Sequence, residues 1–192
     1  NLTTGQIQQA RRALKTVNAL LADTTKVAPE LRAELAFVAF AIAVLLHLPV
    51  SERLPAIQDF APLLPPGLRA FALYVQAHYL YLQGHYEKSC GIIEAALTMG
   101  GSNYPISAIY LHLAAVMNYM SLKQVDVAEQ HLRDAWALAQ PDDLIEAFGE
   151  HHGLLGGMLE SVFKKDWPDD FRRIINITYR FSWGWRQIHN PI

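Results

Sequence analysis

Apolar positions recur every three to four residues along most of this chain. Between residues 68 and 83, for example, Leu73, Ala77 and Leu80 fall on one helical face. No stretch alternates apolar and polar residues between turn signals, as a strand would. Proline and glycine divide the chain, and the pattern predicts helices over residues 5–22, 29–47, 52–62, 68–83, 86–99, 105–122, 125–140, 143–164 and 168–186. Because the linkers are short, neighbouring helices should pack antiparallel.

Part of this pattern repeats. The most regular copy runs from Gln83 to Leu97, with Gly84 at a turn before the second helix. Another copy, Ala128–Leu138, is offset from it by about 39 residues, and a weaker copy begins at Glu52. The residues in place of the turn glycine are Gln124 in one copy and His47-Leu48-Pro49 in the other. Helix–turn–helix units with a period of about 34 residues are typical of tetratricopeptide repeats.

We therefore predict one all-α domain, a tetratricopeptide-like superhelix of stacked antiparallel helix pairs. Its repeats are expected at 29–62, 68–99 and 105–140, with the end of a preceding repeat at 1–22 and a divergent terminal pair at 143–186. Small residues should let the helices of this stack approach closely: Ser89, Ala96, Ala128 and Ala135. An irregular helical bundle is the alternative.

The concave wall of such a stack is lined by the first helix of each pair. Spacing places an aromatic and methionine-rich stripe there, and its candidate binding residues are Tyr74, His78, Tyr81, Tyr110 and Met117. Tyrosine and methionine suit a peptide, a helix or a small apolar ligand. The same stripe could instead pack against another helix of the chain.

Composition narrows the class of protein. Hydrophobic residues make up 52% of the chain and charged residues 18%, which is too apolar for disorder. A net charge of −2 gives no overall attraction to nucleic acid or to an anionic membrane. The apolar run from Leu35 to Leu46 is shorter than the roughly 20 residues of a membrane span, so we expect a buried helix. With no secretory signal and a single cysteine, Cys90, a cytoplasmic protein is expected.

Catalytic and cofactor motifs are missing from the sequence. It has neither a glycine-rich phosphate loop nor a G-x-S-x-G elbow, so no enzyme activity and no cofactor are expected. His151 and His152 are adjacent and would point about 100° apart on a helix, so no metal site is expected there. Glycines 153, 156 and 157 lie within a predicted helix, which implies either a close contact or a break in that helix.

The order of these features resembles the helical-repeat region of large LuxR-type bacterial transcription regulators, the group of the maltose-regulon activator. The resemblance lies in Gln83–Leu97, Ala128–Leu138, the segment 147–155 and the tail Phe181–Ile192. In that family a nucleotide-binding switch domain precedes the repeats and a helix-turn-helix DNA-binding domain follows them. The resemblance implies a regulatory or sensor module that binds a protein or small-molecule effector and contacts neighbouring domains. DNA binding by this segment alone is not expected.

Two other functions remain open: a free-standing repeat adaptor, and a helical domain of an enzyme with catalytic residues elsewhere. The chain lacks an initiator methionine, and its last helix carries large aromatic residues, Phe181, Trp183 and Trp185. These residues should fold back on the terminal pair or meet another domain, and Asn190-Pro191 should begin a linker. A DNA-binding helix-turn-helix is therefore expected to follow Ile192 in the gene.

Overall fold

The computed structural model describes residues 6–22 and 27–190, and every regular element within them is a helix, as predicted. The predicted start at residue 5 and the linker beyond Asn190 lie outside the described residues. The helices are α1 (Ile7–Ala22), α2 (Pro29–Leu45), α3 (Ile57–Phe60), α4 (Pro66–Leu82), α5 (Tyr86–Thr98), α6 (Pro105–Ser121), α7 (Val125–Ala139), α8 (Glu146–His151), α9 (Lys164–Asp166) and α10 (Pro168–His189). None of the described helices is both long and apolar enough to cross a membrane.

Proline and one recurring turn set the ends of the main helices. Helices α2, α4, α6 and α10 each begin with proline, whose fixed φ suits the first turn and whose missing N–H is not needed there. Two residues after the last residue of α2, α4 and α6 the backbone takes a positive φ, at His47 (50°), Gly84 (77°) and Lys123 (61°). In all three turns, the N–H of that residue donates to the carbonyl three residues earlier, and the N–H of the following residue donates to the carbonyl five residues before it. This is the pattern of a Schellman motif. Lys123, rather than the expected Gln124, thus takes the place of Gly84.

The helices pack as consecutive pairs. Helix α4 packs against α5 and α6 against α7, while α6 also contacts α4 and α5, and α2 contacts α4. The small residues singled out from the repeat are buried at these contacts, as expected: Ser89, Ala96, Ala128 and Ala135. Ser89 also ties three helices together, because its Oγ donates to the carbonyl of Ala77 (2.7 Å) and accepts from Asn118 Nδ2 (2.8 Å).

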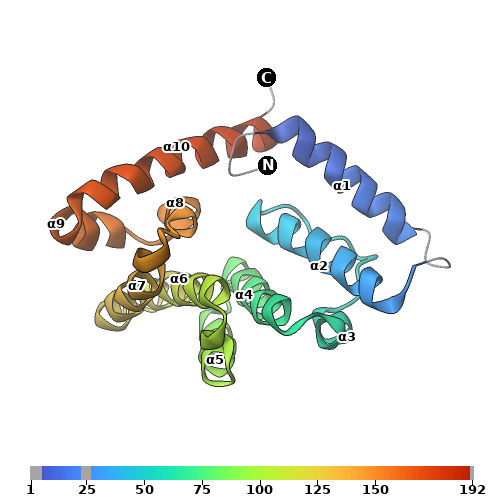
Figure 1. Ribbon diagram of the computed structural model, residues 1–192, viewed down its shortest axis with the longest axis horizontal. Helices are drawn as coiled ribbons and strands as arrows, with labels where there is room; N and C mark the ends of the chain where they lie inside the picture. Colours follow the sequence, from blue (N-terminus) through green and yellow to red (C-terminus); the bar gives the residue numbers. More distant parts are fainter. Residues whose placement is uncertain (1–5, 23–26, 191–192) are drawn as a thin grey trace.

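The chain bends round until its last helix meets its first (Figure 1). Helix α10 packs along α8 and then reaches α1, where the guanidinium of Arg11 donates to the carbonyl of Gln187 (3.1 Å). At the same end, His189 Nε2 donates to the carbonyl of Leu46 after α2 (2.7 Å). Helix α10 therefore spans the concave side of the arc, which the sequence pattern did not predict.

Two predicted helices are wrong in extent. Residues 52–62 form only α3 and a 3-10 turn at Ala61–Leu63, because Pro55 and Pro62 interrupt the segment. The predicted helix 143–164 divides into α8, a 3-10 turn at His152–Leu154, a π-helical stretch at Leu159–Phe163, and α9. Gly156 (φ 62°) and Gly157 (φ 84°) turn the chain between these pieces, so a break explains both glycines.

Gly149, within α8, has a different role. A Cβ added there would lie 2.4 Å from Cγ2 of Ile177 and 3.1 Å from the carbonyl oxygen of Ile174, both on α10. The absent side chain is therefore what lets α8 and α10 approach so closely. This contact holds α10 close to α8.

Candidate ligand-binding cavity

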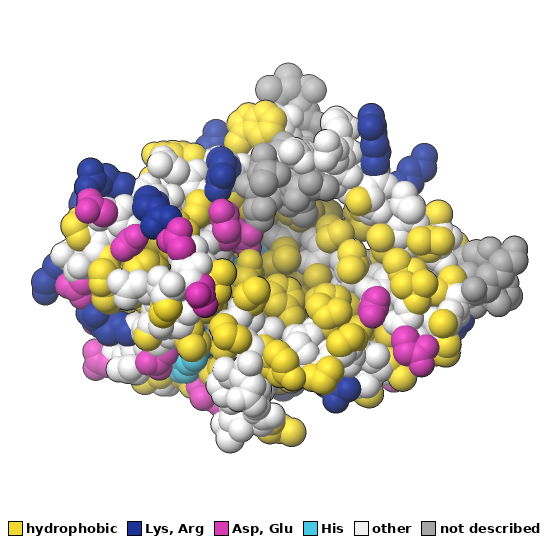
Figure 2. All heavy atoms as spheres, in the orientation of Figure 1, with side chains coloured by type: hydrophobic (Ala, Val, Ile, Leu, Met, Phe, Trp, Pro, Cys, Tyr) yellow, Lys and Arg dark blue, Asp and Glu magenta, His cyan; other side chains and the backbone are white. Residues whose placement is uncertain are grey.

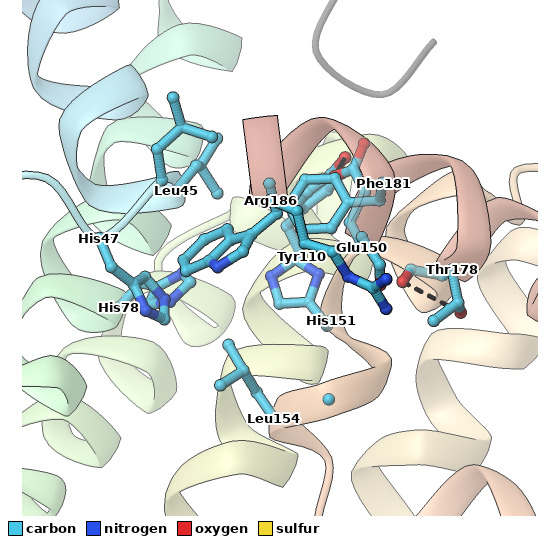
Figure 3. Close-up of a pocket in the computed structure, with 15 residues that line it drawn as sticks. Leu45, His47, His78, Tyr110, Glu150, His151, Leu154, Thr178, Phe181 and Arg186 are labelled. Atoms are coloured by element: carbon cyan, nitrogen blue, oxygen red, sulfur yellow. Dashed lines mark hydrogen bonds between the residues drawn. The ribbon is translucent and has the colours of Figure 1, made fainter. Parts of the chain in front are cut away.

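Closure of the arc leaves a cavity of about 440 Å³ between the first helices and α10. On this face of the molecule, hydrophobic side chains gather in a hollow (Figure 2). Five parts of the chain line the cavity. The end of α2 contributes Leu45, Leu46 and His47, α4 contributes His78, and α6 contributes Tyr110. The other residues come from α8 and the turn after it (Gly149, Glu150, His151, Gly153 and Leu154) and from α10 (Thr178, Phe181, Ser182, Trp185 and Arg186). Figure 3 shows His47 and His78 on one side and Thr178 on the other. The site thus combines five elements that are distant in the sequence.

A chain of buried hydrogen bonds lies behind one wall. The hydroxyl of Tyr74 is 2.7 Å from His151 Nε2 and 3.1 Å from His78 Nδ1, and His151 Nδ1 is 2.7 Å from the carbonyl oxygen of Ala147. A carbonyl only accepts, so His151 carries its proton on Nδ1. Burial lowers the pKa of His151 to about 4, so its Nε2 is a bare acceptor near pH 7 and the Tyr74 hydroxyl donates to it. The Tyr74 oxygen must then accept from His78 Nδ1.

These assignments leave His78 Nε2 with a lone pair and no partner. The His78 side chain is 2% exposed, and among the described residues nothing hydrogen-bonds to Nε2. Burial lowers the pKa of His78 well below its usual value, and His151 and His47 beside it lower the pKa further, so the ring stays neutral. An unpaired buried acceptor costs about 1–3 kcal/mol. A bound molecule that donates a hydrogen bond to Nε2 would remove that cost.

Glu150 is the second polar point of the cavity. Its Oε2 accepts a hydrogen bond from the hydroxyl of Tyr110 at 2.8 Å. Desolvation raises the pKa of Glu150 to about 7, and the charge of Glu146 adds to the rise, while the Tyr110 hydrogen bond opposes it. Glu150 therefore changes charge near neutral pH. It can accept from a bound donor when ionised and donate when protonated.

The five predicted binding residues fall in three environments. His78 and Tyr110 line the cavity, and His78 is 2% exposed. Tyr74 and Met117 are 0% exposed, so the expectation that they form part of an open surface is wrong. Tyr81 does not line the cavity; its ring packs on those of His78 (6.2 Å) and Tyr86 (5.5 Å). The difference arises because α8 and α10 cover the wall that the first helices form.

Other cavity residues were not identified as binding residues from the sequence. The sequence pattern singled out His151 only as a possible metal ligand and Phe181 and Trp185 only as aromatic residues in need of cover, and it did not single out Glu150 as a binding residue. Phe181 and Trp185 do fold back, since both are partly buried and line the cavity, whereas Trp183 remains 55% exposed. The sequence contained one signal for this contact. The first helices have an apolar face that no helix of the predicted pairs covers, and the last helix has an aromatic face that could cover it.

Comparisons with protein-family models, with curated proteins and with solved structures found no match. The chemistry of the cavity must therefore be judged from its own residues. Its walls are largely apolar, and its polar groups are three imidazoles, a carboxyl, hydroxyls, an indole N–H and a guanidinium. A small number of polar groups in an apolar enclosure is typical of ligand recognition.

Proposed function

We propose that this chain is the sensor module of a LuxR-type transcription regulator, and that its cavity binds a small, largely apolar effector with a hydrogen-bond donor. The observation that carries the proposal is the unpaired Nε2 of His78, a buried acceptor on a residue that lines the cavity. The effector's donor would pair with Nε2, and its apolar body would lie against the leucines, Phe181 and Trp185. No cofactor takes part and no reaction is expected.

The size of the cavity favours a small molecule over a protein partner. Ligand pockets span about 300–1,000 Å³, and the volume here is about 440 Å³. A peptide helix is about 10 Å across with its side chains and needs an open groove. Helix α10 crosses the concave side where such a groove would be (Figure 1). An adaptor that binds peptides in its concave face is therefore the less favoured alternative.

The repeat architecture and the family are part of the same proposal. Support comes from the consecutive pairs α4–α5 and α6–α7 and from the shared turn that ends α2, α4 and α6. Together they favour a divergent tetratricopeptide-like superhelix over an irregular bundle. We further propose that the module works in the cytoplasm, beside switch and DNA-binding domains of the same chain.

The cavity also offers a route from binding to regulation. One wall belongs to α2, α4 and α6 and the other to α10, so an effector that touches both walls stabilises the closed arc. The free energy by which the effector stabilises the closed arc equals the difference between its binding free energies for the closed and the opened arc. The contacts of α10 with α1 and with the end of α2 would carry this change toward neighbouring domains.

Calorimetry with matched compounds tests the proposal. We would titrate the protein with a panel of phenols, aliphatic alcohols and amines small enough for the cavity, each paired with its O- or N-methylated analogue. At least one donor compound should bind ten-fold or more tightly than its analogue. In His78→Phe, which keeps an aromatic ring but removes both ring nitrogens, that preference should disappear. Trp183→Ala, a change on the outer face of α10, should leave it intact.

Hydrogen exchange provides the second readout. Bound effector should slow amide exchange in α10, because the ligand links that helix to α4. The proposal is rejected if no compound of the panel binds, or if donors and methylated analogues bind equally. Binding of peptides in place of the panel would support the adaptor.

A further inference from the structure

A second cluster of ligating side chains lies away from the cavity, between α5, α6 and α7. His112 stands two residues beyond Tyr110 on α6, about 200° round the helix and so on nearly the opposite face. It meets His131 and Asp134, which are three residues apart and share one face of α7. The proposed effector site uses none of these residues.

The potential ligand atoms converge closely. His112 Nδ1 lies 2.9 Å from His131 Nδ1. One ring nitrogen of each histidine and a carboxylate oxygen of Asp134 all lie within 4.8 Å of one another. All three side chains are partly buried. This is the only such group of three or more histidine, cysteine or acidic residues among the described parts of the chain.

The surroundings orient the ligands as in protein metal sites. Oε1 of Glu94, on α5, lies 3.2 Å from Nε2 of His131. The hydroxyl of Tyr119 donates to the same oxygen at 3.1 Å. The ring of Tyr119 stacks on that of His131, with centroids 5.4 Å apart and planes 13° from parallel. His131 therefore donates from Nε2 to a carboxylate and turns the lone pair of Nδ1 toward His112. In protein zinc sites, a histidine that binds the ion through one ring nitrogen commonly donates the N–H of the other to a carboxylate.

We propose that His112 Nδ1, His131 Nδ1 and the carboxylate of Asp134 bind a divalent transition-metal ion, Zn²⁺ best, with water as the fourth ligand. Two imidazoles and one carboxylate suit Zn²⁺, for which Mg²⁺ and Ca²⁺ are poor substitutes because they prefer oxygen. The ion would link α6 to α7 within one helix pair. Its role is to stabilise that pair and to make its stability depend on metal supply.

The geometry needs only a small adjustment. Tetrahedral zinc with Zn–N bonds of about 2.0–2.1 Å places two nitrogens roughly 3.3 Å apart. The present 2.9 Å separation of the two Nδ1 atoms is a hydrogen bond, so one of them holds a proton. Since Nε2 of His131 donates to Glu94, that proton belongs to His112. On metal binding it moves from Nδ1 to Nε2 of His112, and the two rings part by a few tenths of an ångström.

Calorimetric titration of the chelator-treated protein with ZnCl₂, in a buffer that does not bind zinc, tests the site. We expect one ion per chain, a rise in melting temperature, and tetrahedral d–d absorption when Co²⁺ replaces Zn²⁺. His112→Gln and His131→Gln should each weaken binding by at least 100-fold, and Asp134→Asn by about 10-fold. Glu94→Gln, which leaves all three ligands in place, should weaken it about 10- to 100-fold.

His85→Ala is the matched control, since His85 is an exposed histidine on the turn before α5, and zinc should bind this variant as tightly as the parent. Circular dichroism shows whether each variant is folded. His112→Asn and His131→Asn replace any glutamine variant that does not fold. Absence of zinc binding by the parent overturns the proposal. So does binding that survives loss of both histidines, or that is weakened equally by His85→Ala.

Discussion

Replacing Glu150 with glutamine should change how the stability of this protein depends on pH. Glutamine cannot ionise, yet its side-chain oxygen can still accept the hydrogen bond from Tyr110. The groups that act on the charge of Glu150 include Tyr110 on α6 and Glu146 on its own helix, and Arg186 on α10 lines the same cavity. The variant therefore removes one titration and leaves the rest of this environment in place.

The magnitude follows from the pKa of the carboxyl in the two states. Desolvation raises the pKa of Glu150 from 4.5 to about 7 in the folded protein. Between these values the folded state holds a proton that the unfolded state has released, so the free energy of unfolding falls as pH rises. A difference of about 2.5 in pKa corresponds to roughly 3 kcal/mol. That loss begins near pH 4.5, is complete a little above pH 7, and stays constant at higher pH.

The assay is urea unfolding of the parent and Glu150→Gln at intervals from pH 4.5 to 8.5. The buried imidazole of His151 acts in the opposite sense, because its pKa is lowered to about 4 and stability is lost as pH falls below 6.5. Only the difference between parent and variant therefore isolates Glu150. The two proteins should be about equally stable at pH 4.5, and the variant should be more stable by roughly 3 kcal/mol at pH 8.

Glu87→Gln is the control, since Glu87 is exposed on α5 and its variant should differ from the parent by a small, constant amount. A difference curve for Glu150→Gln that is flat across the range would refute the reasoning. So would one in which the variant gains stability toward low pH.

Three further predictions concern packing and buried hydrogen bonds. Tyr74→Phe should lower the free energy of unfolding by about 1–3 kcal/mol, because it leaves nitrogens of two buried histidines without a partner. Tyr81→Phe is the control and should be nearly neutral. Equal effects of the two variants in thermal melts would contradict the hydrogen-bond assignment. Gly149→Ala should lower the free energy of unfolding by about 1–3 kcal/mol or more, because the added Cβ clashes with Ile177. Gly91→Ala, in open space on α5, should instead raise the free energy of unfolding by up to about 1 kcal/mol. Urea unfolding that shows no loss for Gly149→Ala would argue against the tight α8–α10 contact. Ala135→Leu should overpack the 0% exposed site on α7 and cost about 1–3 kcal/mol, and an unchanged melting temperature would disprove close packing there.

The main helices could be predicted from the sequence because their signals are local. Apolar periodicity, proline at the first turn and a turn after each helix lie within a few residues of one another, so α4, α5, α6 and α7 match their predicted bounds to within two residues. Local signals failed where they conflicted. Residues 143–164 have helical periodicity but also carry Gly156 and Gly157, which take positive φ and divide the segment.

The turns show how far local chemistry reaches. Glycine marks one of three equivalent helix ends, while His47 and Lys123 adopt the same left-handed conformation at the other two. Such residues take positive φ only at a cost, which the hydrogen bonds of the turn offset. The offset of about 39 residues between the copies places Lys123 opposite Gly84, so the assignment of the third turn to Gln124 was one residue too late.

The site depended on contacts that sequence spacing cannot supply. Spacing grouped Tyr74, His78, Tyr81, Tyr110 and Met117 as one stripe on neighbouring helices, and it left open whether that stripe was covered. The answer came from α10, which contributes Phe181 and Trp185 across more than 60 residues of chain, and from Gly149, which lets α8 bring it close.

The sequence by itself thus determined the helical class, the main helix pairs and the small residues between them, because these follow from periodicity and turn chemistry within about 40 residues. Tertiary structure decided which residues are accessible and which are buried. It placed Tyr74 and Met117 in the core, left His78 with an unpaired nitrogen at a cavity, and brought His112 within 2.9 Å of His131. The physical reason is that burial and side-chain pairing depend on how distant helices close on one another, and that closure follows from the packing of the whole chain rather than from any one segment.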